Sequence, residues 1–219
     1  MNKNLKNLAL WSEKLGIILS QTQLNHFQFY HEFLLNWNQK INLVSRKDIE
    51  RIISYHFIDS ISAITEIPKN SIVADLGAGA GLPGIPIKIV RDDITLYLIE
   101  SIQKKAYFLS QVIQTIPLQN TFVLNQRAES IKDKKPILTT RSGFDIILVR
   151  LFGKIPDVIP TASKLLNKNG KIIFYKISGV EAEINKAEKI AKKNHLQLEN
   201  IKDIKLPVTN IVRKLVIYS

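Results

Sequence analysis

The sequence predicts an α/β protein with a mostly parallel, Rossmann-like sheet of seven strands and a helical extension at the N-terminus. Two observations carry this prediction. After residue 70, short runs rich in β-branched residues alternate with segments of helical periodicity, which is typical of a parallel sheet with helices on both faces. The first of these runs ends at Asp75, and four glycines follow within eight residues. A strand, a glycine turn and a helix start let a ligand lie against the backbone.

The composition excludes several classes of protein. The 219 residues suffice for one sizeable core, and a hydrophobic content of 45% is ordinary for a globular chain. No apolar run reaches the length of a membrane span, and the first residues are amphipathic, unlike a signal peptide. The chain has no cysteine, which excludes disulfides, thiolate metal sites and a cysteine nucleophile. We therefore expect a cytoplasmic protein with no metal site.

The net charge of +12 has two interpretations. It fits a polyanionic partner, above all nucleic acid. It also fits a composition that is simply rich in lysine, which requires no special partner. Charge alone does not decide between them.

Residues 1–66 are predicted to be helical and to pack on a domain formed by residues 67–219. Ser20 and Gln23 have the spacing of a capping box. Apolar residues recur behind them at helical spacing. These residues are Leu24, Phe27, Leu34, Trp37 and Ile41. Ser45 with Asp48 predicts a second helix start, followed by a regular 3-4 stripe of apolar residues between positions 49 and 64.

The rest of the chain alternates between strands and helices. The strands are expected at 71–75, 95–100, 121–125, 144–150, 171–176, 196–204 and 210–218. The helices are expected at 83–91, 102–114, 153–166 and 180–194. Too few residues join the last two strands for a parallel crossover, so we predict that these two pair antiparallel. Residues 126–143 are expected to form a loop or a short helix.

The glycine turn allows two interpretations. Gly79, Gly81 and Gly84 spell GxGxxG, the dinucleotide fingerprint, but that motif should open directly after its strand, and here Gly77 comes first. Asp75 with Gly77, Gly79 and Gly81 instead spells DxGxGxG, which is similar to the pattern of class I S-adenosylmethionine methyltransferases. The position of Asp75 at the strand end favours the second interpretation.

Later strand ends add further candidates at the same edge of the sheet. Glu100 ends the second strand, where a carboxylate can accept hydrogen bonds from ribose hydroxyls; a helix cap is the alternative, since Ser101 follows. Arg150 ends the fourth strand, which lacks the Asn/Asp-Pro-Pro-aromatic motif typical of exocyclic-amine methylation. Without a cysteine, covalent methylation of pyrimidine C5 is also excluded. A ring nitrogen or an acidic group remains as the acceptor.

The chain resembles the RsmG family, also called GidB, the bacterial 16S ribosomal RNA guanine-N7 methyltransferases. Motifs along nearly the whole chain carry the resemblance: WNQKINLVS, HFIDSI with His56, Asp59 and Ser60, DLGAGAGLPGIP, ES-x-x-KK, VRLF, Lys176, KLP and Arg213. The family usually has Asp where this chain has Glu100, which keeps the carboxylate. Ile177-Ser178 stands where Lys-Gly is commoner.

The resemblance implies a class I S-adenosylmethionine-dependent enzyme that methylates N7 of one guanine near the decoding centre of the small ribosomal subunit. The expected cofactor residues are Asp75, Gly77, Gly79, Gly81, Leu82, Glu100, Ala128, Glu129 and Arg150. Arg150 and Lys176 are candidates for positioning the substrate. The candidate RNA contacts are Arg46, Lys104, Lys105, Lys176 and Arg213, with Lys40 and Lys47 as further basic residues. The partner is 16S rRNA in the small subunit, and a monomer is expected.

Three alternatives remain open. One is a methyltransferase acting on another RNA site or on a protein, the second is a nucleotide-dependent oxidoreductase, and the third is a non-catalytic RNA-binding module with a cofactor pocket. The role of His56 is open too. It lies on the apolar stripe, so burial with a hydrogen bond is favoured over direct chemistry, and one helix cannot aim His56, Asp59 and Ser60 as a relay.

Overall fold

The computed structural model describes residues 3–131, 143–207 and 211–219 and confirms the predicted fold class. Seven strands form one sheet in the order β3-β2-β1-β4-β5-β7-β6. All neighbouring strands are parallel except those that pair with β7, which is antiparallel to both β5 and β6. The strands are β1 (Ile72–Leu76), β2 (Thr95–Ile99), β3 (Thr121–Leu124), β4 (Phe144–Arg150), β5 (Leu166–Lys176), β6 (Leu198–Lys205) and β7 (Val212–Tyr218).

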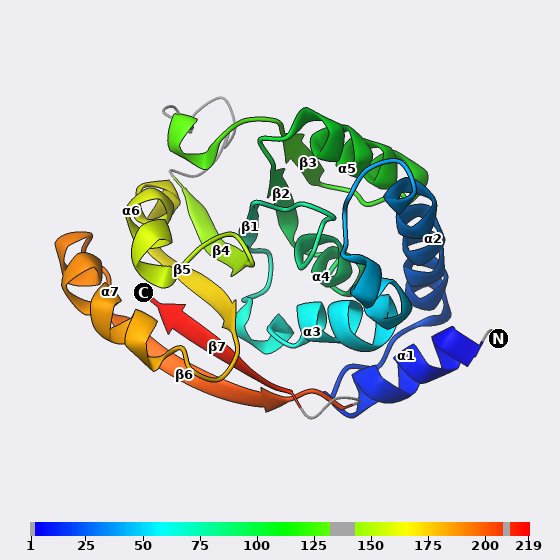
Figure 1. Cartoon of the computed structure of the whole chain (residues 1–219), viewed down its shortest axis with the longest axis horizontal. Coiled ribbons are helices and arrows are strands. Elements are labelled where there is room, and N and C mark those ends of the chain that lie inside the picture. Colours follow the sequence, from blue (N-terminus) through cyan, green and yellow to red (C-terminus); the bar gives the residue numbers. More distant parts are fainter. Residues whose placement is uncertain (1–2, 132–142, 208–210) are drawn as a thin grey trace.

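Helices cover both faces of this sheet (Figure 1). One core lies between the sheet and the N-terminal helices with α4 and α5, and a second lies between the sheet and α6 with α7. Alternate residues of β4 point to opposite sides, since Ile146 and Leu148 belong to the first core and Ile147 and Val149 to the second. The helices are α1 (Lys3–Glu13), α2 (Gln21–Asn38), α4 (Gly84–Val90), α5 (Gln103–Thr115), α6 (Ile155–Leu165) and α7 (Glu181–Lys193).

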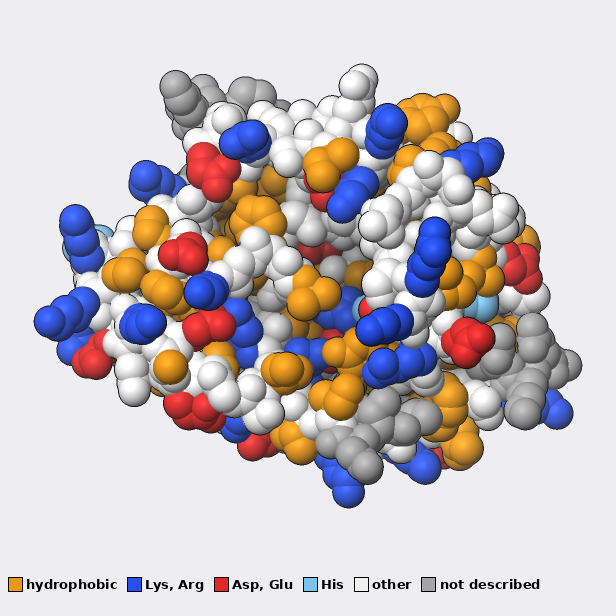
Figure 2. Space-filling view, viewed as in Figure 1, with side chains coloured by type: hydrophobic (Ala, Val, Ile, Leu, Met, Phe, Trp, Pro, Cys, Tyr) orange, Lys and Arg blue, Asp and Glu red, His pale blue; other side chains and the backbone are white. Residues whose placement is uncertain are grey.

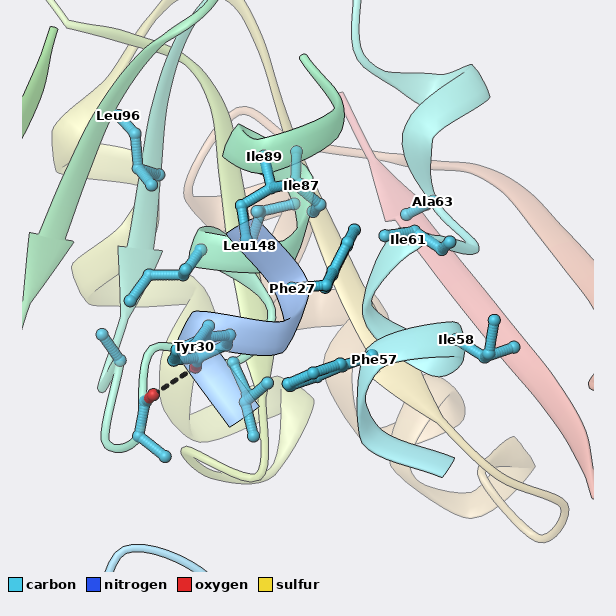
Figure 3. Close-up of a cluster of buried hydrophobic side chains, with 14 of the residues drawn as sticks. Phe27, Tyr30, Phe57, Ile58, Ile61, Ala63, Ile87, Ile89, Leu96 and Leu148 are labelled. Atoms are coloured by element: carbon cyan, nitrogen blue, oxygen red, sulfur yellow. Dashed lines mark hydrogen bonds between the residues drawn. The ribbon is translucent and has the colours of Figure 1, made fainter. Parts of the chain in front are cut away.

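Helix α2 begins at the predicted capping box. The backbone N–H of Gln23 donates to Oγ of Ser20, and the Gln23 side chain accepts from the N–H of Ser20. Its buried face carries Tyr30, whose hydroxyl donates to the carbonyl of Ala80 inside the glycine turn at 2.5 Å (Figure 3). Helix α2 therefore contacts the glycine turn directly.

The segment after α2 is less regular than predicted. Instead of one amphipathic helix it forms a 3₁₀ turn η1 (Arg46–Arg51), a π-helical turn η2 (Ile52–Phe57) and α3 (Ile58–Ile61), followed by the 3₁₀ turn η3 (Ile64–Glu66). The predicted stripe positions from Ile52 to Ile61 are buried, but the single regular helix is wrong, because residues 56–61 are all buried and this end of the segment has no solvent side to set a helical period. Short π-helical turns often occur at functional sites.

The remaining elements differ from prediction mainly at their ends. Strand β5 begins at Leu166 rather than at 171, with an irregular register next to Phe144. In the predicted loop at 126–143, residues 128–130 form the 3₁₀ turn η4 (Ala128–Ser130), and residues 132–142 lie outside the described residues. None of the helices that the structure describes is long and apolar enough to cross a membrane.

Candidate active site

The glycine turn after β1 uses backbone conformations that glycine adopts readily. Gly77, Gly79 and Gly81 have φ angles of 67°, 56° and 85°. The N–H groups of Gly77 and Ala78 donate to the carbonyl of Ile99 at 2.9 and 3.1 Å. These two bonds fix the turn against the end of β2.

A pocket of about 370 Å³ opens beside this turn, and we call it the glycine-turn pocket. Five of the residues predicted to hold a cofactor line it, namely Gly77, Gly79, Glu100, Ala128 and Glu129. The other lining residues are Ile99, Ser101, Ile102, Lys105, Gln126, Arg127, Leu151 and Phe152. The segments that follow β1, β2, β3 and β4 thus meet at one edge of the sheet, where ligands bind in open α/β folds.

Glu100 joins the glycine turn to the start of α5. Its carboxylate accepts from the N–H of Gly79 at 2.9 Å and from the N–H of Ile102 at 2.8 Å. The Ile102 contact is the helix-start role that the sequence offered as an alternative. The same side chain lines the pocket, so its position is compatible with both roles.

Asp75 lies behind the turn and is almost completely buried. Its Oδ2 accepts from the N–H of Gly84, the first residue of α4, at 2.8 Å. Its Oδ1 is buried and has no hydrogen-bond partner among the described residues. Burial raises the pKa of this carboxyl to about 7, although the Gly84 bond and the charge of Arg150 act in the opposite direction. The free oxygen is an acceptor that a bound amino or hydroxyl group could satisfy.

Three predicted cofactor residues, Asp75, Gly81 and Leu82, are buried and do not line the glycine-turn pocket. A Cβ added to Gly81 would lie 2.3 Å from Cδ1 of Ile85, so the absence of a side chain there serves close packing of the turn on α4. Their contacts with a cofactor stay predictions.

Arg150 lies in a second pocket of about 370 Å³, which we call the Arg150 pocket. Its other lining residues are Tyr55, Leu151, Gly153, Lys154, Tyr175, Lys176, Ile177, Glu183 and Arg213. Leu151 lines both pockets, so the two adjoin each other. Figure 2 shows the hollow at the centre of this face, with Lys and Arg side chains around it.

A fully buried carboxylate, Asp59, holds the Arg150 pocket together. Its Oδ2 accepts from Nε of Arg150 at 2.8 Å and from Nη2 of Arg213 at 2.9 Å, and its Oδ1 accepts from Nε of Arg213 at 2.5 Å. These residues come from α3, β4 and β7. One carboxylate between two guanidinium groups leaves a net positive charge at the base of the pocket.

His56 completes this cluster as a neutral residue. Nη2 of Arg150 lies 2.6 Å from Nδ1 of His56, and a guanidinium can only donate, so Nδ1 accepts and Nε2 carries the proton. Burial, and then the charge of Arg150, lowers the pKa of His56 to about 4. Ser60 donates to the backbone carbonyl of His56 rather than to its ring. The three residues therefore form no proton relay.

The predicted RNA contacts lie in different environments. Lys105 lines the glycine-turn pocket, and Lys104 and Arg46 are exposed. Lys176 lines the Arg150 pocket with its Nζ 2.8 Å from Glu183. Arg213 lines that pocket too, but it is buried and bonded to Asp59. The last two residues thus offer less free charge than the first three.

Sequence reasoning missed three residues of this region. Tyr30 fits the helical spacing of α2 and could have been included in its stripe. Ile102 is half-exposed at the start of α5, and the sequence could have indicated it as an apolar residue that lies outside the buried stripe of that helix. Leu151 is exposed and has a φ of 57°, which nothing in the sequence indicates. Its neighbour Phe152 lies against the glycine turn, since a Cβ on Gly77 would lie 2.1 Å from the Phe152 ring.

The glycine-turn pocket fits S-adenosylmethionine. Glu100 lines the pocket and can accept from ribose hydroxyls, and the glycines allow close approach of the backbone. Together with the strand order, these features define a class I S-adenosylmethionine-dependent methyltransferase. Two solved structures share this fold: M. jannaschii TYW2 in complex with AdoMet, with a TM-score of 0.58, and a SAM-dependent methyltransferase from Aquifex aeolicus, with a TM-score of 0.57. Their sequence identities are 17% and 11%, and they cover 82% and 80% of this chain and 78% and 98% of their own chains.

The sequence of this chain belongs to one family of that class. The family described as rRNA small subunit methyltransferase G matches residues 23–212, and the chain is a member of it. The relative named Ribosomal RNA small subunit methyltransferase G from Bacillus subtilis is 32% identical over 204 residues, which are 92% of this chain and 84% of that protein. The relative of the same name from Carboxydothermus hydrogenoformans is 32% identical over 213 residues, or 97% and 89% of the two chains. The family resemblance drawn from the motifs is confirmed.

Proposed function

We propose that this chain methylates N7 of a guanine in 16S ribosomal RNA near the decoding centre, with S-adenosylmethionine as the methyl donor. The observation that carries the proposal is the pair of adjoining pockets at the carboxyl edge of the sheet. The glycine-turn pocket fits the cofactor, and the Arg150 pocket is lined by four cationic side chains against two carboxylates, the lining Glu183 and the buried Asp59 beneath it. Membership in a small-subunit RNA methyltransferase family supports the substrate class.

The proposed chemistry places few demands on the protein. S-Adenosylmethionine supplies an electrophilic methyl group. Guanine N7 presents an in-plane lone pair and carries no proton, so no residue has to act as a general base. The neutral, buried state of His56 agrees with this. The chain then acts mainly by holding N7 in line with the methyl group.

Arg150 is the residue best placed to position the substrate. Its Nε and Nη2 are bonded to Asp59 and His56, whereas its Nη1 has no hydrogen-bond partner among the described residues. A fixed guanidinium with its Nη1 amino group free can bind guanine O6 or a phosphate. It should contact the edge of the base rather than its face, because the purine gains positive charge during methylation.

The remaining parts of the proposal concern the RNA and the state of the protein. The target base has to leave its stack to reach a pocket at the sheet edge. The candidate phosphate contacts are the exposed Lys104 and Arg46 and the half-buried Lys105, which lines the glycine-turn pocket. We infer a monomer acting in the cytoplasm, which the lack of cysteine and the RNA substrate support.

Methyl transfer onto small-subunit RNA tests the proposal directly. RNA from a strain lacking this modification is incubated with the protein and labelled S-adenosylmethionine, both naked and as assembled 30S particles, and the modified base is mapped. We expect label at a single guanine N7. Label elsewhere, or none in either substrate, would contradict the proposal.

Two further measurements separate the roles of the pockets. Calorimetry should detect binding of S-adenosylmethionine and none of NAD. Arg150→Lys keeps the charge but removes the planar fork, so we expect slower methyl transfer with nearly unchanged cofactor affinity. A large loss of cofactor affinity in Arg150→Lys would instead assign Arg150 to the cofactor, as the family resemblance suggests.

A further inference from the structure

An exposed aromatic side chain stands beside unpaired lysines on α5. Tyr107 is 56% exposed and lines a pocket of about 430 Å³ together with Gln103, Lys104 and Asn125. We call this the Tyr107 surface, and we include Trp37, Lys40 and Lys105 in it. We propose that it binds a single-stranded segment of RNA by stacking a base on Tyr107. The inference rests on the proposed function, and it says where the nucleotides next to the target guanine bind.

The aromatic groups form a fixed platform. The ring of Tyr107 meets Trp37 edge-on, with 5.8 Å between ring centroids and an interplanar angle of 63°. Trp37 is itself held by Phe33 and the buried Phe108, at centroid distances of 6.0 and 5.8 Å. The Trp37 contact involves only an edge, and Tyr107 stays more than half exposed, so part of its ring is free for stacking. An exposed ring held in this way can receive a base with little loss of side-chain freedom.

The positive charges around this platform are not neutralised. Lys40, Lys104 and Lys105 form no ion pair with any described residue, and Nζ of Lys40 lies 5.7 Å from the centroid of the Trp37 ring. Elsewhere on the molecule, lysines such as Lys171 and Lys192 are paired with glutamates at 2.6 and 3.0 Å. Unpaired lysines beside an exposed ring are the combination that binds a nucleic-acid backbone and its bases together.

The Tyr107 surface is continuous with the candidate active site. Lys104 lines the Tyr107 pocket, and the next residue, Lys105, lines the glycine-turn pocket. Likewise, Asn125 lines the Tyr107 pocket and Gln126 lines the glycine-turn pocket. A strand whose target base enters the active site can therefore continue over the first turn of α5. A protein partner is less favoured, because lysines are depleted from the centres of protein interfaces.

Binding of a 12-nucleotide single-stranded oligoribonucleotide tests this inference. The chain has two tryptophans, so Trp11→Phe leaves Trp37 as the only tryptophan reporter. In that background, bound RNA should quench Trp37 fluorescence. We expect Tyr107→Ala to weaken binding about fivefold or more with an unchanged salt slope, and Tyr107→Phe to retain binding. Lys104→Ala should lower the slope of log affinity against log salt by about 0.7. Lys192→Ala, in the exposed pair with Glu188 on α7, is the matched control and should change neither quantity.

The outcomes distinguish this inference from the proposed function. If wild-type protein methylates 16S RNA but Tyr107→Ala binds the oligonucleotide as tightly as wild type, the inference is overturned and the function stands. If Tyr107→Ala impairs binding to assembled particles only, the surface binds a protein, which also overturns the inference. If methyl transfer is absent while RNA binding depends on Tyr107, the inference is supported and the proposed function is wrong.

Discussion

The glycine-turn pocket and the Arg150 pocket lie side by side but are built in opposite ways. The first is built around one short stretch, residues 75–84, which backbone N–H groups and glycines fix in place, and the segments after β2, β3 and β4 complete its walls. The second depends on charged side chains brought together from α3, β4 and β7. A backbone turn can tolerate the loss of one side chain. A buried charge cluster cannot, because each remaining charge has lost its hydration.

The largest expected effect therefore comes from the Arg150 pocket. Asp59→Ala removes the one carboxylate between two buried guanidinium groups, and breaking a buried ion pair from one side costs about 3–5 kcal/mol. Urea unfolding should show this loss in the free energy of unfolding. Asp203→Ala, which removes an exposed pair with Lys214, is the control and should cost less than about 1 kcal/mol. Equal losses in the two variants would remove the contrast between buried and exposed pairs.

The second effect concerns the pH dependence of the free energy of unfolding, to which Asp75 and His56 contribute with opposite signs. The pKa of Asp75 is raised from 3.8 to about 7, so between these values the folded chain binds more protons than the unfolded chain, and stability falls as pH rises. The pKa of His56 is lowered from 6.5 to about 4, so in that window the unfolded chain binds more protons, and stability rises with pH.

Single substitutions should separate these slopes. Between about pH 4.5 and 6.5, Asp75→Asn should leave the rising dependence of His56, and His56→Gln should leave the falling dependence of Asp75. The measurement is the free energy of unfolding in urea at several pH values. Indistinguishable slopes in the two variants would show that neither group is perturbed as described.

A smaller effect is expected for Glu100→Gln. Gln keeps the size of the side chain but loses its charge, and one of the two acceptor oxygens becomes an NH₂ group that cannot accept from a backbone N–H. One of the bonds to Gly79 and Ile102 is therefore lost, and the proposed ribose contact weakens. Hydrogen bonds to charged groups contribute about 1.5–3 kcal/mol, so S-adenosylmethionine affinity should fall by about tenfold or more in calorimetry. Glu188→Gln on α7 serves as a control of the same chemistry. Unchanged cofactor affinity in Glu100→Gln would reduce Glu100 to a helix-start residue.

The smallest effect tests the contact between the N-terminal helices and the glycine turn. Tyr30→Phe removes only the hydroxyl that donates to Ala80 and should lower the free energy of unfolding by about 1 kcal/mol. Because Ala80 lies within the turn, cofactor affinity should fall with it. A loss of stability with unchanged cofactor affinity would show that α2 supports the fold without setting the turn.

Much of the fold followed from local patterns, and the wrong predictions arose where tertiary contacts set the local structure. The strands, the α5 and α7 helices and the Ser20 cap were predictable because hydrophobic periodicity and capping depend on residues a few positions apart. The segment at 46–61 was not predictable as three kinds of helix, because it passes from an exposed start at Arg46–Arg51 to a fully buried end at residues 56–61, where its geometry follows its neighbours. The start of β5 at Leu166 likewise depends on pairing with β4.

The sequence by itself determined the acid–glycine turn, Glu100 and the family, since these depend on residues close together in the chain. Only the tertiary structure decided that Asp59 lies between Arg150 and Arg213, which are 91 and 154 positions away. It also brought Tyr30 to the glycine turn and left Tyr107 more than half exposed beside unpaired lysines. Such contacts exist only after the sheet has formed and the N-terminal helices have packed on it. Their energies depend on burial, which no local pattern specifies.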